Sequence, residues 1–161
     1  MAKEITIIGT TKKEKYENLI SQIKHLLSDE TDMISGLSNF LSAIHFTFNF
    51  LWTGIYFVKG DFLVLGPFQG PVACSRIPYG KGVCGTSWKR KKAIIVKDVN
   101  KFPGHIACSS KSRSEIVIPI LNSKKSVTAV LDIDSEKLSN FDRIDLHYLK
   151  KALKSVLKFF E

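Results

Sequence analysis

The chain has 161 residues, 44% of them hydrophobic and 24% charged, with a formal net charge of +9. This length and composition are typical of one globular domain, so we expect a single domain over residues 1–161 that has an N-terminal extension at residues 1–10. The odd number of cysteines, three, argues against the disulfide framework of a small secreted protein.

The distribution of charge and hydrophobicity excludes two further classes. The basic residues are scattered and lack the interleaved aromatics of a base-stacking surface, so no nucleic-acid partner is predicted. The apolar run Ile5–Ile8 is too short for a signal-peptide core. Polar residues interrupt the apolar region Ala43–Val58, whereas a membrane helix needs about 20 mostly apolar residues. We therefore expect a cytoplasmic protein that does not cross a membrane.

Two amphipathic helices are predicted in the N-terminal part. Residues 12–28 carry apolar side chains at intervals of three and four, with lysines and glutamates on the other face. After a polar break, residues 33–44 repeat this apolar pattern. From Phe46 to Phe50 apolar and polar residues alternate, which favours extended chain from this point onward.

Strands dominate the middle of the chain. The expected strands are residues 51–58, 62–68, 93–96, 115–121 and 127–133. The first two are predicted to form a hairpin about the turn Lys59-Gly60-Asp61. Residues 69–85 are rich in glycine and proline and are expected to form a loop that leads into a short helix ending near Lys89.

A last helix is predicted to begin near Asn140, with Ser139 and Asp142 as a variant capping box and an apolar face that extends to Phe160. This order of elements predicts an α+β fold. We expect one antiparallel sheet of about five to six strands, with the N- and C-terminal helices packed on one face. PAS- or GAF-like sheets of this kind hold a small-molecule pocket, covered by long loops, on the opposite face.

Candidate chemistry is concentrated in the loop F-P-G-H-I-A-C-S-S-K-S-R-S-E at residues 102–115. Here Cys108 follows His105 by three residues and precedes Glu115 by seven. A cysteine of low pKa needs a basic or polar setting of this kind, and the ionised thiolate is the nucleophile. The sequence thus indicates a reactive thiol at the mouth of the sheet, where His105 could raise the thiolate fraction.

Other side chains would complete a pocket. Asp132 and Asp134 fall on one face of their strand, where paired carboxylates are costly, and Trp52 and Tyr56 could form an aromatic wall. If the cysteines gather there, one thiolate could attack an electrophile and a second thiol could convert the resulting sulfenic acid to a disulfide. An acid kept neutral by a second carboxylate could protonate a leaving oxygen.

Ordinary structural roles compete with these interpretations. A lone cysteine that is buried is usually inert core filler, His105 is typical of an exposed loop, and Trp52 and Tyr56 would suit a plain core. The pair of aspartates could instead mark a solvent-facing strand end. A zinc site made of the three cysteines and His105 would lack the closely spaced ligand pair of structural zinc sites, so no metal is predicted.

A series of short motifs resembles one known family. These motifs are W-T-G-I-Y at 52–56, L-G-P-F-Q-G at 65–70, A-C at 73–74, G-V-C-G at 82–85, F-P-G-H-I-A-C at 102–108, S-E-I-V at 114–117, L-D-I-D-S at 131–135 and F-D at 141–142. Together, and in this order, they resemble the free methionine-(R)-sulfoxide reductases, which are single-domain GAF enzymes. The resemblance runs from about residue 10 to the end of the chain.

This resemblance implies a GAF fold, often a homodimer, and reduction of free methionine-R-sulfoxide rather than the protein-bound form, with no metal or organic cofactor. It implies that Cys108 attacks the sulfoxide sulfur and is left as a sulfenic acid, and that Cys74 forms a disulfide with it. A thioredoxin-type reductant would recycle the enzyme. Cys84 matches a third family cysteine, an alternative resolving residue. The matching substrate-binding residues are Trp52, Tyr56, Glu115, Asp132 and Asp134.

One position departs from the family pattern. The family has an acid directly after the catalytic cysteine, as A-C-D, whereas this chain has Ser109. Loss of that negative charge favours the Cys108 thiolate, and it removes a side chain that could anchor the loop. The competing hypotheses are a GAF-type module that senses a small ligand without catalysis and a basic nucleic-acid-binding domain. The presence of all three cysteines and all three acids favours the enzyme.

Overall fold

The computed structural model describes residues 4–161, whose strands form a six-stranded sheet in the order β3-β2-β1-β6-β5-β4. Every neighbouring pair is antiparallel. The strands are β1 (Trp52–Lys59), β2 (Phe62–Gln69), β3 (Arg76–Pro78), β4 (Ile94–Val96), β5 (Ser114–Leu121) and β6 (Val127–Ser135). The helices are α1 (Lys12–Leu26), α2 (Met33–Phe48), α3 (Gly82–Arg90) and α4 (Arg143–Leu153), with short 3-10 helices η1 (Val99–Lys101) and η2 (Leu157–Phe159). The predicted α+β architecture is confirmed.

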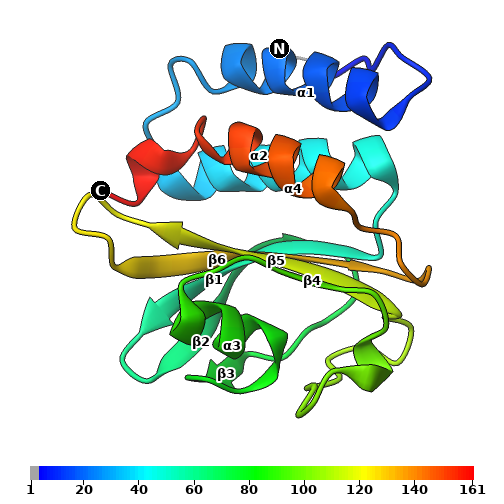
Figure 1. The fold of residues 1–161 in the computed structure, drawn as a ribbon. Coiled ribbons are helices and arrows are strands. Elements are labelled where there is room, and N and C mark those ends of the chain that lie inside the picture. Colours follow the sequence, from blue (N-terminus) through cyan, green and yellow to red (C-terminus); the bar gives the residue numbers. More distant parts are fainter. Residues whose placement is uncertain (1–3) are drawn as a thin grey trace.

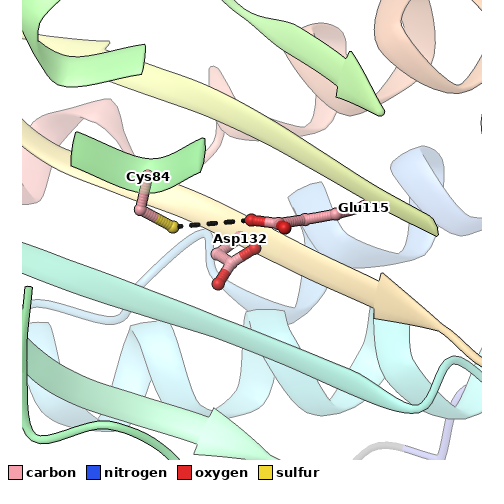
Figure 2. Close-up of side chains that lie close together, drawn as sticks. All are labelled: Cys84, Glu115 and Asp132. Carbon is pink, nitrogen blue, oxygen red and sulfur yellow. Dashed lines mark hydrogen bonds between the residues drawn. The ribbon is translucent and has the colours of Figure 1, made fainter. Parts of the chain in front are cut away.

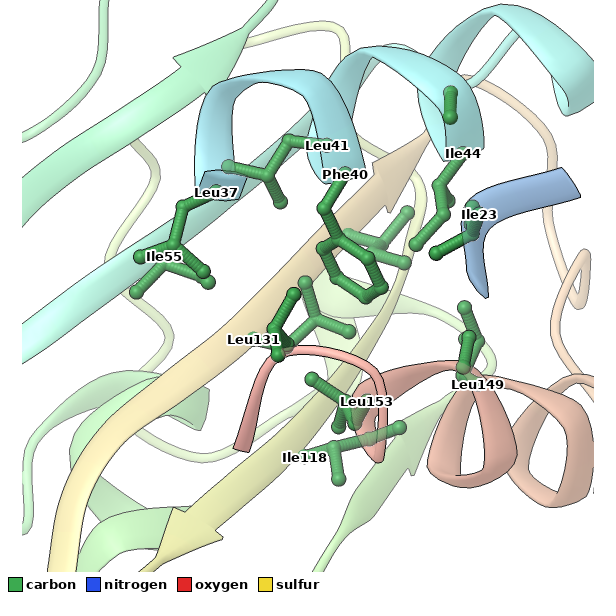
Figure 3. Packing of buried hydrophobic residues seen from close by; sticks show 14 of the residues in the cluster. Ile23, Leu37, Phe40, Leu41, Ile44, Ile55, Ile118, Leu131, Leu149 and Leu153 are labelled. Carbon is green, nitrogen blue, oxygen red and sulfur yellow. The ribbon is translucent and has the colours of Figure 1, made fainter. Parts of the chain in front are cut away.

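Three helices cover one face of the sheet, and α3 lies on the other (Figure 1). Helices α2 and α4 contact the strands, while α1 packs on both of them as an outer layer. Figure 3 shows the core between these layers, where side chains of α2 and α4 meet those of the central strands. Fully buried members of this core include Leu37, Phe40, Leu41, Ile44, Ile55, Leu131 and Leu149. Burying each such side chain contributes about 1.5–3 kcal/mol.

Strand alternation separates the two faces of the sheet. Ile116 and Ile133 point into the core under the helices, whereas their neighbours Glu115 and Asp132 point to the face that carries α3. Because successive strand residues face opposite sides, this register brings polar groups of β5 and β6 together on the α3 side.

The N-terminal segment lies along α1. Gln22 exchanges two hydrogen bonds with the backbone of Thr6, at 2.7 and 3.0 Å, and Asn18 accepts one from the backbone N–H of Ile8 at 3.2 Å. Within the predicted extension of residues 1–10, residues 1–3 lie outside the described residues. The helix itself begins with a capping box between Thr11 and Glu14.

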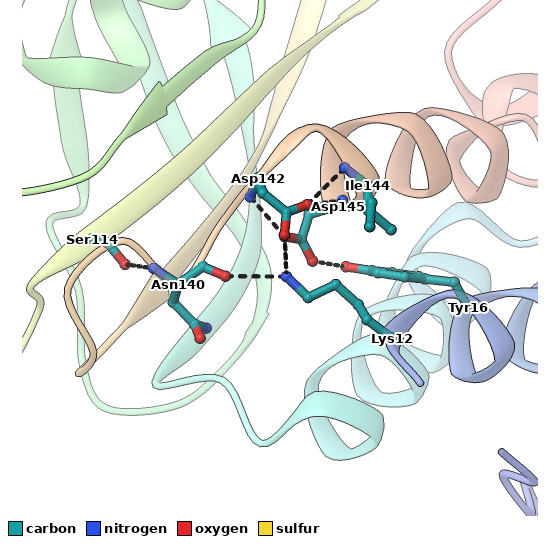
Figure 4. Close-up of polar contacts among 7 residues, drawn as sticks. All are labelled: Lys12, Tyr16, Ser114, Asn140, Asp142, Ile144 and Asp145. Carbon is teal, nitrogen blue, oxygen red and sulfur yellow. Dashed lines mark hydrogen bonds and ion pairs between the residues drawn. The ribbon is translucent and has the colours of Figure 1, made fainter. Parts of the chain in front are cut away.

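A buried carboxylate joins α1 to the start of α4 (Figure 4). Asp145, which is 1% exposed, accepts hydrogen bonds from Lys12 Nζ at 2.6 Å and from Tyr16 Oη at 2.9 Å. Lys12 also contacts Asp142 at 2.9 Å and the carbonyl oxygen of Asn140 at 3.3 Å. A buried charge with this many partners fixes how the first and last helices meet.

The expectation of extended chain from Phe46 onward is wrong, because α2 continues to Phe48. Phe48 lies four residues after Ile44 and eight after Phe40, so it continues the helical stripe, while Phe46 is 66% exposed. Asn49 ends the helix in the left-handed conformation, with φ of 52°.

The predicted ends of the last helix also need correction. Its N-cap is Asp142, which forms a reciprocal capping box with Asp145, while Ser139 lies in the preceding turn with φ of 52°. The helix ends at Leu153, and the apolar pattern reaches the buried Phe160 only through a separate 3-10 turn. Strand β3 was not predicted from the sequence, because three residues are too few for a periodic signal.

Candidate active site

A disulfide joins Cys74 and Cys108, whose sulfur atoms are 2.09 Å apart and whose Cα atoms are 5.4 Å apart. Cys74 lies in the loop between β2 and β3, and Cys108 lies in the loop that leads into β5. The bond therefore holds together two loops on the face of the sheet opposite α1, α2 and α4.

A small cavity of about 40 Å³ lies next to this disulfide. Every site residue predicted from the sequence lines it except Cys74, which is bonded to the lining residue Cys108. Typical ligand sites have volumes of roughly 300–1,000 Å³. The disulfide form is thus closed around a set of polar groups with no room for an amino acid.

Three carboxylates converge on this cavity from two paired strands. Glu115 of β5 lies directly opposite Asp134 of β6, and Asp132 is two residues earlier on the same face. Glu115 and Asp132 are 5% and 6% exposed, and Asp132 Oδ1 is buried without a hydrogen-bond partner. A buried polar atom without a partner is costly, so the arrangement is typical of a binding site rather than of a packed core.

Cys84 belongs to the same cluster. It lies in the first turn of α3, 3% exposed, and its Sγ is 3.8 Å from Oε1 of Glu115. Figure 2 shows the side chains of Cys84, Glu115 and Asp132 pointing toward one another. Their ligand atoms all lie within 4.8 Å of one another, so these three are the described residues that could hold a metal ion.

Burial gives the three acids different proton affinities. It raises the pKa values of Glu115 and Asp132 well above their ordinary range, and the neighbouring carboxylates raise them further. Burial also raises the pKa of Asp134, to about 6, although a hydrogen bond from Ser112 opposes this rise. At neutral pH the site therefore holds protonated acid beside one carboxylate that is largely ionised.

Aromatic rings of β1 form one wall of the cavity. Trp52 stacks between Tyr56 and Phe68, with ring centroids 5.7 and 5.4 Å away, and Tyr56 Oη donates a hydrogen bond to the carbonyl oxygen of Cys74 at 3.0 Å. Gly54 makes room for the indole, because a Cβ at this position would lie 2.2 Å from Trp52 Cη2. The aromatic wall thus depends on a glycine and also supports the Cys74 loop.

His105 lines the cavity, but it faces an acid. Its Nε2 lies 3.9 Å from Oε2 of Glu115, and its side chain is 14% exposed. Burial lowers the pKa of His105, so at neutral pH the ring is mainly neutral. His105 is therefore not an exposed loop histidine, which was the competing interpretation of the sequence. It is also not a permanent cation beside Cys108.

Two serines of the loop have different surroundings. Ser109, where the family pattern has an acid, accepts a hydrogen bond from the backbone N–H of Lys111 at 3.3 Å and so keeps a local turn. Ser112 is buried and donates to Asp134 Oδ1 at 2.5 Å. Sequence reasoning missed Ser112. The alternation of charged Lys111 and Arg113 with Ser112 and Ser114 indicates that the two serines face inward, but it does not indicate which group Ser112 contacts.

A bonded cysteine pair beside buried acids, on a sheet with the fold of GAF domains, is typical of an oxidoreductase built on this fold. The chain belongs to the free methionine-R-sulfoxide reductase family. It is 40% identical to the free methionine-R-sulfoxide reductase of Saccharomyces cerevisiae, over 91% of this chain and 86% of the yeast protein. It is 52% identical to GAF domain-containing protein A of Dictyostelium discoideum, over 96% of this chain and 98% of that protein.

Among solved structures, the free methionine-R-sulfoxide reductase of Neisseria meningitidis in complex with its substrate matches with a TM-score of 0.94 and 43% identity. The match covers 99% of this chain and 96% of that chain. No family model matches the sequence. Within residues 4–161, no helix has the length and apolar character needed to cross a membrane.

Proposed function

We propose that this protein reduces free L-methionine-(R)-S-oxide to methionine. The observation that carries the proposal is the Cys74–Cys108 pair beside Glu115, Asp132 and Asp134, at a cavity whose acids differ in protonation. The yeast relative and the solved Neisseria structure bear the name of this activity. Sulfoxide reduction needs both elements of the site, a nucleophilic thiol and a proton donor for the oxygen.

In the first step, the thiolate of Cys108 attacks the sulfoxide sulfur while a neutral acid protonates the sulfoxide oxygen. The S–O bond of the substrate breaks, methionine is released, and the oxygen passes to Cys108 as a sulfenic acid. Cys108 is oxidised by two electrons and the substrate is reduced by two. Glu115 and Asp132 are the proposed proton donors, because burial favours their neutral forms.

In the second step, the thiol of Cys74 attacks the sulfur of Cys108, displaces the oxygen as water and forms the disulfide. A dithiol reductant of the thioredoxin class then reduces the disulfide and is itself left as a disulfide. Both loops must separate for the next substrate to enter, because the cavity in the disulfide form is only about 40 Å³. Reduction thus opens the site as well as restoring the nucleophile.

Substrate recognition follows from charge. The ammonium group of a free amino acid would pair with the ionised carboxylate of Asp134, and the aromatic wall of Trp52 and Tyr56 would take the apolar end. A methionine residue within a protein has no ammonium group, so its binding would leave the carboxylate buried and unpaired. This difference accounts for a preference for the free amino acid.

The decisive experiment measures methionine release from free methionine-R-sulfoxide under thioredoxin recycling. Two matched compounds serve as controls. The S epimer changes only the configuration at sulfur, and an N-acetylated R-sulfoxide lacks the ammonium group. Turnover of the free R form alone is the expected result. No turnover by folded, reduced protein would contradict the proposal and leave a ligand-sensing GAF module as the better account.

A further inference from the structure

Ser112 connects the loop that carries Cys108 to the acids of the sheet. It lies four residues after Cys108 and three before Glu115, and it is 7% exposed. Its hydroxyl donates to Asp134 Oδ1 at 2.5 Å, and no other side-chain hydrogen bond to Asp134 is formed within residues 4–161. Because this buried hydroxyl donates its hydrogen bond to a carboxylate of the cavity, Ser112 can affect how that carboxylate is oriented and ionised.

The backbone on the C-terminal side of Ser112 is fixed from two directions. The N–H of Arg113 donates to the carbonyl oxygen of Ser135 at 2.8 Å, and the carbonyl oxygen of Arg113 accepts from the N–H of Val99 at 3.0 Å. The Ser114 hydroxyl adds a bond to the carbonyl oxygen of Lys137 at 2.6 Å. The strand end that follows Ser112 is therefore fixed to neighbouring segments, and this places the Ser112 hydroxyl beside Asp134.

The groups that face Asp134 give it no cation. They are Glu115 from β5, Asp132 from its own strand, Tyr56 from β1 and Cys84 from α3. His105, the histidine that lines the cavity, contacts Glu115 instead. Within residues 4–161, no lysine or arginine forms an ion pair with Asp134. Ser112 is thus the donor that favours the carboxylate without supplying a charge that would compete with an ammonium group.

We propose that Ser112 is a positioning residue that orients the Asp134 carboxylate for the ammonium group of the substrate and ties it to the loop of the nucleophile. One oxygen of Asp134 is held by the serine, which leaves the other for the ligand. This inference rests on the proposed function, since it assigns the amino-acid specificity of that site. Burial raises the pKa of Asp134 and the serine hydrogen bond lowers it, which agrees with this role.

The test compares Ser112→Ala with Ser112→Thr, which keeps the hydroxyl, and with Ser110→Ala, which removes an exposed hydroxyl from the same loop. All three are made in a Cys108→Ser background, so that methionine-R-sulfoxide binds without turnover. We expect Ser112→Ala to raise the dissociation constant roughly fivefold to tenfold at neutral pH. The same change should move the acid limb of binding upward by about half a pH unit or more. The other two variants should behave like the background.

A second measurement does not depend on the substrate. Carboxyl carbon NMR follows the titration of Asp134 in the free protein, with and without Ser112→Ala, and the pKa of Asp134 should rise in the variant. An unchanged pKa, or a loss of affinity that is equal at every pH, would overturn the role of Ser112. Failure of the background protein to bind the sulfoxide at all, together with a shifted pKa, would count against the proposed function and leave the role of Ser112 at Asp134 intact.

Discussion

Cys84 Sγ lies 3.8 Å from Oε1 of Glu115, in the first turn of α3 and away from solvent. Burial raises the pKa of this thiol well above its ordinary value, and the charges of Asp132 and Glu115 raise it further. A thiol that resists ionisation is a poor nucleophile. In this structure Cys84 is a hydrogen-bond donor to an acid, while Cys74 already holds Cys108.

The first prediction is that Cys84 acts as a hydrogen-bond donor and not as the resolving cysteine. Cys84→Ser should retain thioredoxin-dependent turnover within about fivefold of the wild type, because a hydroxyl replaces a weak S–H donor to Glu115. Steady-state methionine release under thioredoxin recycling provides the measurement. Loss of recycling in Cys84→Ser, with single-turnover chemistry intact, would show that Cys84 resolves the sulfenic acid.

The two bonded cysteines should fail in different ways. Cys108→Ser should release no methionine, since the nucleophile is gone. Cys74→Ser should release a single stoichiometric methionine and then stop, because the Cys108 sulfenic acid has no neighbour with which to form a disulfide. Rapid-quench counting of methionine per enzyme distinguishes these cases. Repeated turnovers with thioredoxin in Cys74→Ser would contradict the assignment of Cys74.

Substrate binding should depend on pH through Asp134. Its pKa in the folded protein is raised to about 6, so the carboxylate loses its charge as the pH falls through this value. Affinity for methionine-R-sulfoxide should therefore increase as pH rises from 5 to 7, by up to about tenfold per unit on the acid side, and then level off. Calorimetry on Cys108→Ser measures this without the thiol titration. Asp134→Asn supplies the control, in which the dependence should disappear.

The contact between α1 and α4 predicts a large effect on stability. Lys12→Met should lower the free energy of unfolding by about 2 kcal/mol, because it leaves the buried Asp145 carboxylate with one cationic partner fewer. Tyr16→Phe removes only a neutral donor to the same carboxylate and should cost about 1 kcal/mol. Urea denaturation of the two variants and the wild type measures these losses in unfolding free energy. An equal or larger loss in Tyr16→Phe would mean that the ion pair is not the dominant contact.

The sequence predicted the fold, and the position of the three acids on one face of the sheet, because both depend on periodic patterns. Alternation along β5 and β6 places Glu115, Asp132 and Asp134 on one face whatever surrounds the sheet. Helix α2 was cut short in the prediction because Phe46, Phe48 and Phe50 satisfy a strand period, and only packing decides that Phe48 continues the helical stripe.

The hydrogen-bond partners in the site were beyond the reach of the sequence. That Cys84 faces Glu115 depends on how α3 lies against β5, and that Ser112 reaches Asp134 depends on where the loop crosses the end of β6. Such contacts join elements far apart in sequence, so no local pattern encodes them. The pKa differences among the three acids follow from these contacts and from burial, and were equally inaccessible.

The last prediction tests the aromatic wall through Gly54. In Gly54→Ala the new methyl group would lie 2.2 Å from Trp52 Cη2 and 2.7 Å from Phe68 Cβ, so the indole must move. We expect a loss of about 1–3 kcal/mol in unfolding free energy, as for other overpacked sites, and weaker binding of the sulfoxide because the wall is displaced. Thermal denaturation and calorimetry measure the two effects. In a Trp52→Leu background the cost of Gly54→Ala should shrink, since the clashing ring is absent. The same cost in both backgrounds would place the strain in the strand rather than in the wall.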